Sequence, residues 1–151
     1  MSKFKKNSGF TLIEILVVIG IIAILAAVVI IAINPARQFA QARNTQRWSN
    51  VNTILNAVGQ RMVDSRGLWT VNATCTATLP STSTVIGTGV TNANLEPCIV
   101  PTYVSTMVVD PSVGTVASTG YSIFVGANGR ITVSAPKAEL QSEVGAISVT
   151  R

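Results

Sequence analysis

The sequence predicts an α+β protein in which a long N-terminal α-helix packs on a small antiparallel β-sheet head. Three observations carry this prediction. Residues 15–33 form a run of 19 apolar or small residues without charge, residues 35–66 place apolar side chains at helical spacing, and Asn128-Gly129 separates two runs of β-branched residues. The 151 residues give room for one head domain of ordinary size.

The apolar run predicts a helix that crosses a membrane. At about 1.5 Å per residue, 19 helical residues span roughly 28 Å, close to the thickness of a bilayer's hydrocarbon core. The many Ile and Val residues would suit a strand in water, but an unpaired strand in lipid leaves backbone groups unsatisfied. We therefore expect residues 10–34 to form a transmembrane helix. Pro35 removes a backbone donor and predicts a kink there.

A second, amphipathic half of the helix is expected from Pro35 to about Arg66, ending near Gly67. Its apolar residues recur at spacings of three and four, which predicts one stripe buried against the head. The stripe consists of Trp48, Val51, Leu55, Val58 and Met62, and most other positions are polar, including Arg43, Arg47, Asn50 and Arg61. Core packing explains this stripe better than ligand binding does.

The rest of the chain predicts the β head, so that residues 35–151 comprise the amphipathic helix and a globular domain. Residues 70–91 are rich in Ser and Thr and predict loops with short strands at most. Asn72-Ala73-Thr74 within them is a weak pattern for glycan attachment. Residues 121–134 predict a hairpin around Asn128-Gly129, and residues 146–150 a further edge strand.

The positive charge of the chain is concentrated at its start. Eleven basic and six acidic residues give a net charge of +5, and Lys3, Lys5 and Lys6 lie in the first nine residues. Without those three lysines, eight basic residues face six acidic ones and the net charge is +2. Basic residues before an apolar span keep that end cytoplasmic, so we expect the C-terminal domain to lie outside the plasma membrane.

Two cysteines, Cys75 and Cys98, lie in the part expected to be exported, where thiols tend to pair. A disulfide there would close a loop of about 24 residues and stabilise the domain by roughly 3 kcal/mol. Two separate reduced thiols are the alternative. The chain has no histidine, and two cysteines alone make no zinc site, so no metal is expected.

The segment Gly9-Phe10-Thr11-Leu12-Ile13-Glu14 resembles the processing motif of type IV pilin precursors and of the related type II secretion pseudopilins. The resemblance is specific over about the first 35 residues and implies a pilin-like fold. It implies that residues 1–9 are a leader, that a prepilin peptidase cuts between Gly9 and Phe10, and that Phe10 becomes N-methylated. Residues 10–34 would then anchor the subunit in the plasma membrane and later form the filament core.

The same resemblance implies the partners and the destination of the protein. The subunit would assemble with copies of itself into a helical filament outside the cell or on its surface. A pilus assembly platform and its ATPase machinery would extract it from the membrane. In the family, the proline lies about one turn earlier than Pro35 does here.

Glu14 is the residue that an ordinary membrane anchor explains least well. A carboxylate one turn into an apolar span costs a few kcal/mol unless it is paired or lies near the interface. The amine created at Phe10 by cleavage is a natural partner, within one chain or between neighbouring subunits. The resemblance implies the pairing between subunits. A Glu14 carboxylate that reaches water at the end of a single-pass anchor is the alternative.

Other functions have less support. A pseudopilin, or a minor pilin that binds DNA or a surface at a filament tip, would share the N-terminal motif. Arg37, Arg43 and Arg47 could form a basic strip for nucleic acid, although pairing and solvation on the helix explain them more simply.

No enzyme or cofactor site is expected, because the chain lacks histidine, nucleophile elbows and phosphate loops, and because its acids are scattered and fit a solvated surface. The acids concerned are Asp110, Glu139 and Glu143, and no acidic cluster predicts a calcium site.

Overall fold

The structure is a computed structural model that describes residues 9–151, without the side chains of Glu143 and Val144. Lys3, Lys5 and Lys6 of the expected leader therefore lie outside the described residues, as does the expected surface position of the Glu143 side chain. The chain divides into two compact units, residues 1–38 and 39–151, and each is described by itself.

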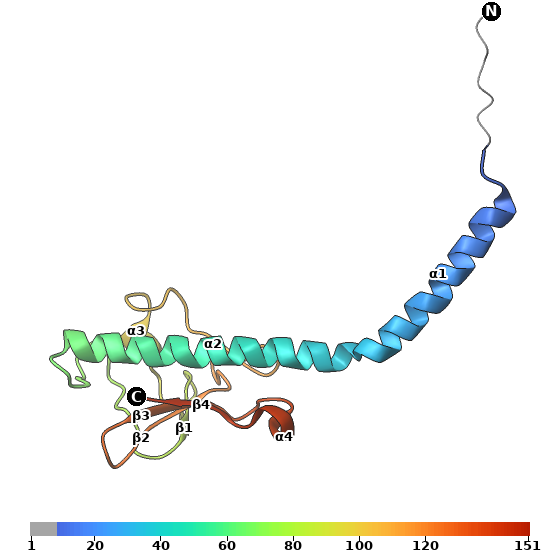
Figure 1. Ribbon diagram of the computed structural model, residues 1–151. Coiled ribbons are helices and arrows are strands. Elements are labelled where there is room, and N and C mark those ends of the chain that lie inside the picture. Colours follow the sequence, from blue (N-terminus) through green and yellow to red (C-terminus); the bar gives the residue numbers. More distant parts are fainter. Residues whose placement is uncertain (1–8) are drawn as a thin grey trace, which may run out of the picture. The chain divides into compact units, whose positions relative to one another are not determined.

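The first unit contains the apolar helix α1, Leu12–Ile33 (Figure 1). Its 22 residues are long and apolar enough to cross a membrane, and none of them is buried by other parts of the chain. The helix ends because Asn34 adopts a left-handed conformation, with φ of 48°. Pro35 follows as the first residue of α2, and the Asn34 side-chain oxygen accepts a hydrogen bond from the Arg37 N–H at 3.4 Å.

Helix α2 extends over Pro35–Asp64, and its end agrees with the expected turn near Gly67. Gly67 has a φ of 85°, and its N–H donates to the Met62 carbonyl at 2.7 Å, which closes the last turn. A left-handed residue without Cβ suits this position because it carries no steric penalty.

The buried stripe of α2 differs in phase from the stripe that the sequence predicts. Val51, Leu55 and Val58 are buried as expected, but Trp48 is 38% exposed. The neighbouring Arg47 is fully buried instead. The prediction for Trp48 was wrong because it assumed that an arginine faces water, whereas Arg47 has ion-pair partners inside the head. The side chains that are buried along α2 are Ala40, Asn44, Arg47, Asn50, Val51, Ile54, Leu55, Ala57, Val58 and Arg61.

The second unit holds a four-stranded antiparallel sheet of order β1-β2-β3-β4, with α2 lying along one side of it (Figure 1). The strands are β1 (Thr84–Val85), β2 (Ser122–Val125), β3 (Ile131–Ala135) and β4 (Ile147–Thr150). Short helices α3 (Glu96–Ile99) and α4 (Gln141–Val144) interrupt the loops. The predicted hairpin is β2–β3, which pairs Val125 with Ile131 around Gly129 at φ 77°. The predicted α+β class is confirmed.

The core of the second unit lies between α2 and the sheet. Ile54 and Val58 of α2 and Ile123 and Val133 of the central strands are all fully buried. Cys75 and Cys98, for which we expected a disulfide, form one and are themselves buried.

Arg61 ties the last turns of α2 to this disulfide. Its guanidinium donates to the carbonyls of Cys98 and Thr70, both at 3.0 Å, and lies 5.1 Å from the centroid of the Trp69 ring. A cation near the carboxyl end of a helix is also favoured by the helix dipole.

Candidate processing and assembly site

The Gly9–Phe10 peptide bond lies in a non-helical segment just before α1. Both residues are exposed, and Phe10 is 85% exposed. A Cβ added to Gly9 would meet no atom within 4 Å, and Gly9 does not have a positive φ. The fold therefore does not require glycine at this position, so a requirement for it would come from a partner that handles this bond.

Thr11 and Glu14 form a reciprocal capping box at the start of α1. The Glu14 N–H donates to the Thr11 hydroxyl oxygen at 3.3 Å. In return, the Glu14 carboxylate accepts hydrogen bonds from the Thr11 N–H at 2.8 Å and from the Thr11 hydroxyl at 2.9 Å. Two backbone donors that a helix start leaves without partners are satisfied in this way.

The capping box supplies a partner for Glu14 that we did not anticipate. In the uncut chain Phe10 contributes an amide and not an amine, so the Thr11 donors are what satisfies the carboxylate here. The pairing of Glu14 with a Phe10 amine stays a prediction for the processed protein. Thr11 could have been found from the spacing Thr11-Leu12-Ile13-Glu14, which is the sequence pattern of a capping box.

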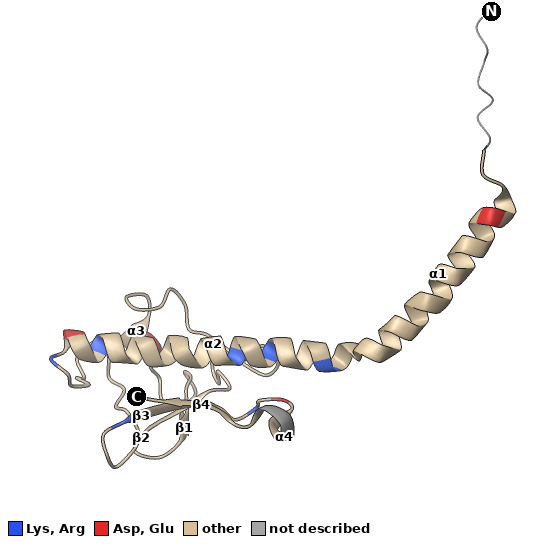
Figure 2. Ribbon diagram, in the orientation of Figure 1, with Lys and Arg blue, Asp and Glu red and all other residues tan. Residues whose placement is uncertain are grey.

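Glu14 is the acidic residue in the first turn of α1, and Figure 2 shows red at that place and neither charge colour along the rest of the helix. The structure thus brings the predicted cleavage residues and the predicted assembly residue together within one short segment. Pro35 lies just after the other end of α1, and Cys75 and Cys98 belong to the second unit.

A second group of polar residues, inside the head, centres on Arg47 and Asp110. Both side chains are fully buried. Arg47 Nε donates to Asp110 Oδ2 at 2.6 Å, and Arg47 Nη2 donates to Asp110 Oδ1 at 3.1 Å and to the Ser112 hydroxyl at 2.6 Å. The Asp110 carboxylate also accepts from the Ser112 and Val113 N–H groups, so the pair is bidentate and well satisfied.

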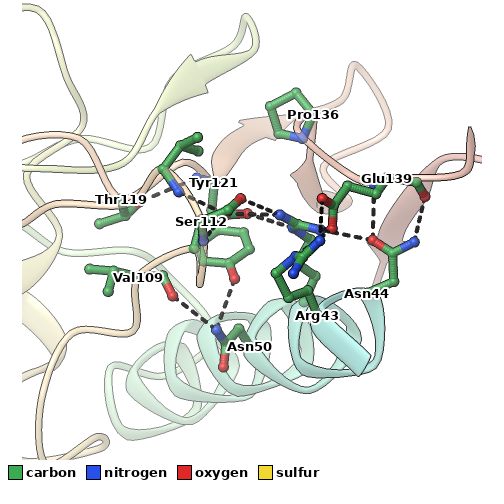
Figure 3. Close-up of polar contacts among 12 residues, drawn as sticks. Arg43, Asn44, Asn50, Val109, Ser112, Thr119, Tyr121, Pro136 and Glu139 are labelled. Atoms are coloured by element: carbon green, nitrogen blue, oxygen red, sulfur yellow. Dashed lines mark hydrogen bonds and ion pairs between the residues drawn. The ribbon is translucent and has the colours of Figure 1, made fainter. Parts of the chain in front are cut away.

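Glu139, whose side chain is 32% exposed, extends this network, and Figure 3 draws its contacts with Arg43 and Asn44. Arg43 donates to its carboxylate through Nε and Nη2, both at 2.8 Å, and Arg47 Nη1 donates to it at 3.1 Å. Asn44 holds the Glu139 backbone: its side-chain oxygen accepts from the Glu139 N–H, and its amide donates to the Glu139 carbonyl. Below the ion pairs, Asn50 donates to the Tyr121 hydroxyl at 2.8 Å and to the Val109 carbonyl at 3.2 Å.

This network corrects the expected surface position of Asp110 and decides between the two interpretations of Arg43 and Arg47. Asp110 does not lie on a solvated surface; it is buried and paired with Arg47, from which 63 positions separate it in the chain. Arg43 and Arg47 do not form an open basic strip, because both are committed to carboxylates of the head. Pairing within the chain, the simpler of the two interpretations of these arginines, is what the structure shows for them.

The pairing lowers the pKa of both carboxyl groups. Burial alone would raise the pKa of Asp110, but hydrogen bonds from Arg47, Ser112 and Val113 outweigh it and hold that pKa well below its usual range. Hydrogen bonds from Arg43, opposed by partial burial and reinforced by Arg47, lower the pKa of Glu139 to about 2. Both groups therefore stay ionised in the folded head at any ordinary pH.

We expect the head to lose stability in acid because of these two groups. A carboxyl whose pKa is lower in the folded than in the unfolded state stabilises the fold above its unfolded pKa, about 4, and this contribution disappears as the pH falls through the folded value. The thermal midpoint of the head should be level from pH 7 to about 5 and fall steeply between about 4 and 2. Glu139→Gln should make that decline shallower, and a midpoint that is unchanged from pH 5 to pH 2 would contradict the assignment.

No group of three or more His, Cys, Asp or Glu side chains that could hold a metal ion occurs among the residues that the structure describes. The polar network itself is neutral, with two arginines facing two carboxylates.

The fold and the N-terminal segment together define a class: a protein with one apolar N-terminal helix that could span a membrane, followed by an α+β head. Residues 4–33 match the family described as the prokaryotic N-terminal methylation motif. That motif is characteristic of precursors of the type IV pilin and pseudopilin kind, and the match covers the N-terminal segment and α1 but not the head. Comparisons with curated proteins and with solved structures found no match.

Proposed function

We propose that the protein is the structural subunit of a type IV pilus-like filament. A prepilin peptidase cuts it between Gly9 and Phe10, Phe10 is N-methylated, and the subunit polymerises through residues 10–34. The observation that carries this proposal is the match of the methylation motif over residues 4–33, a region that ends with α1 and holds one charged residue within that helix.

The exposed apolar surface of α1 supports a function in which lipid covers this helix first and helices of other subunits cover it later. Its large apolar side chains are more than half exposed throughout the helix, and soluble proteins rarely leave so large an apolar surface in contact with water. In the proposed sequence of events, lipid covers α1 while the subunit is stored in the plasma membrane with its head outside. An assembly platform and its ATPase then transfer the subunit into the filament, where α1 helices of other copies replace the lipid.

In the proposed function the Glu14 carboxylate has one partner before cleavage and another in the filament. Before cleavage, the Thr11 N–H and hydroxyl satisfy it within the chain. Cleavage then creates a cation at Phe10, and in the filament core the Phe10 amine of a neighbouring subunit pairs with Glu14. An ion pair away from water must be well formed to be tolerated, so this pairing favours one axial position of neighbouring subunits.

The solvent-facing side of α2 also supports assembly. From Gln41 to Gln60 its exposed positions carry amides, hydroxyls, alanine and one tryptophan, and no charged side chain. An isolated helix in water usually carries charges on that side. Charged residues are depleted and aromatic residues enriched where protein surfaces meet, so this side of α2, with Trp48, fits contact with other copies.

The experiment that tests the proposal replaces Glu14 by glutamine and, separately, by alanine. Glutamine retains the length of the side chain and can complete the capping box, but it carries no charge. We expect both variants to enter the membrane and be processed, and both to show at least about tenfold fewer surface filaments, since each leaves the Phe10 ammonium unpaired in the filament core, which costs about 3 to 5 kcal/mol. Electron microscopy and the amount of subunit in sheared filaments measure the effect.

Two results would contradict different parts of the proposal. Normal filaments from Glu14→Gln together with few from Glu14→Ala would mean that the capping box, and not charge, matters for assembly. Wild-type cells that show no filament containing this subunit would exclude the filament function.

The motif is shared with pseudopilins, which makes a secretion pseudopilin the second candidate function. Deleting the chain would then abolish secretion of exported proteins while no extended surface filament is lost. A minor pilin that binds DNA or a surface at the filament tip is distinguished by abundance, because a tip subunit is scarce in purified filaments and a major subunit forms most of their mass.

A further inference from the structure

The polar network of Arg43, Asn44, Arg47, Asp110 and Glu139 lies at the beginning of the part of α2 that belongs to the head. The second unit starts at Phe39, so Arg43, Asn44 and Arg47 occupy its first helical turns. A pull applied through α1 enters the head along the backbone at this point. Among the printed contacts between α2 and the rest of the head, this network therefore lies close to the point where such a pull enters.

We propose that this network is a force-bearing latch that prevents α2 from sliding along its axis when the subunit is pulled through its N-terminal helix. The inference rests on the proposed function, in which extraction from the membrane and the filament itself both transmit tension through that helix. It adds a mechanical role for residues of the head that take no part in processing or in the filament core.

The latch joins α2 to two separate segments of the head. Arg47 contacts Asp110 in the loop after α3, and Arg43 contacts Glu139 in the loop after β3. Asn44 adds a contact with the backbone of Glu139 on both its N–H and its carbonyl. An axial displacement of α2 must therefore break bonds to both segments together.

The acceptors in the latch are themselves fixed. The Asp110 backbone N–H donates to the Thr119 carbonyl at 2.8 Å, and the Asp110 carboxylate accepts from the N–H groups of Ser112 and Val113. Gly114 packs so closely on the Asp110 backbone that a Cβ at residue 114 would collide with it. The Asp110 loop thus cannot follow α2 without unfolding.

Ion pairs suit this role better than the apolar contacts that follow them along α2. Val51, Ile54, Leu55 and Val58 make non-directional contacts, which weaken gradually as a helix slides. Hydrogen bonds of 2.6 to 3.1 Å between charged groups are lost once the donor and acceptor separate by about another ångström. Buried ion pairs often stabilise a fold no more than apolar residues of the same size. Their presence is therefore explained better by holding α2 in its axial position than by stabilising the fold.

The test compares mechanical with thermal stability in the full chain, held in detergent micelles with handles at its two termini. The double variant Arg47→Met/Asp110→Leu replaces the buried pair by apolar side chains and leaves no unpaired buried charge, but it removes the acceptor of the Ser112 and Val113 N–H groups, so its thermal midpoint is measured alongside. Its head should unfold at least about tenfold faster at the same constant force, because charge-assisted hydrogen bonds that resist the pull are missing. A head of this variant that resists force as the wild type does would overturn the latch.

A matched comparison covers the case in which the double variant is thermally weaker. Leu55→Ala removes an apolar contact of the same helix, and Glu139→Gln weakens the latch at its partly exposed end while the Asn44 contacts to the backbone remain. For an equal loss of thermal midpoint, the latch variants should unfold faster under force than Leu55→Ala. Equal or slower unfolding of the latch variants would refute the proposal. The measurement uses single subunits, so its outcome is separate from whether filaments form.

Discussion

Replacing Asp110 by alanine should reduce the free energy of unfolding of the head by about 3 to 5 kcal/mol. The substitution leaves the fully buried Arg47 guanidinium without its bidentate carboxylate, and an unpaired buried charge costs several kcal/mol. Denaturant titration of the full chain in micelles, followed by the fluorescence of Trp48 and Trp69, measures the loss.

Asp64→Ala is the matched control for this experiment. Asp64 is also a carboxylate with a hydrogen-bond partner, the Tyr103 hydroxyl at 2.7 Å, but it is exposed, and removing it leaves no buried charge. Its unfolding midpoint should stay close to that of the wild type. Equal losses from Asp110→Ala and Asp64→Ala would mean that the Arg47–Asp110 pair does not stabilise the head.

The second large effect is expected at the cleavage site. Gly9→Val should leave the precursor uncut, because a branched side chain at the bond hinders the approach of a peptidase, whereas the chain itself has open space there. Mass spectrometry of the membrane fraction should find the variant subunit with residues 1–9 still attached and with Phe10 unmethylated.

Gly20→Ala serves as the control for this substitution, since Gly20 also has open space around it but lies inside α1. That variant should be cut and methylated as the wild type is. Complete processing of Gly9→Val would show that the peptidase does not require a small residue before the cut.

The local elements of the fold could be predicted because their signals lie close together in the sequence. The absence of charge in residues 15–33, the turn chemistry of Asn128-Gly129 and the glycine at residue 67 each determine an element within a few residues. Processing and assembly residues could be proposed for the same reason, since Gly9, Phe10 and Glu14 form one short pattern.

The polar network could not be predicted because it depends on contacts between residues far apart in the chain. Arg47 is buried only because Asp110 and Glu139 come from two other segments, and a helical pattern alone places an arginine toward water. The assumption that an arginine faces water also placed Trp48 in the predicted buried stripe of α2. Thr11 is different, since Thr11 followed three residues later by Glu14 is itself the sequence pattern of a capping box.

The capping box at Thr11 and Glu14 also determines where α1 begins, and therefore which residues before it stay non-helical. With the first helical N–H groups satisfied by side chains, helix formation does not propagate upstream, and Gly9 and Phe10 keep a non-helical backbone. A peptidase binds its substrate in an extended form, so no hydrogen-bonded turn has to unwind before the bond is cut. For the proposed cleavage, the segment before α1 therefore has a reduced conformational cost of binding to a peptidase.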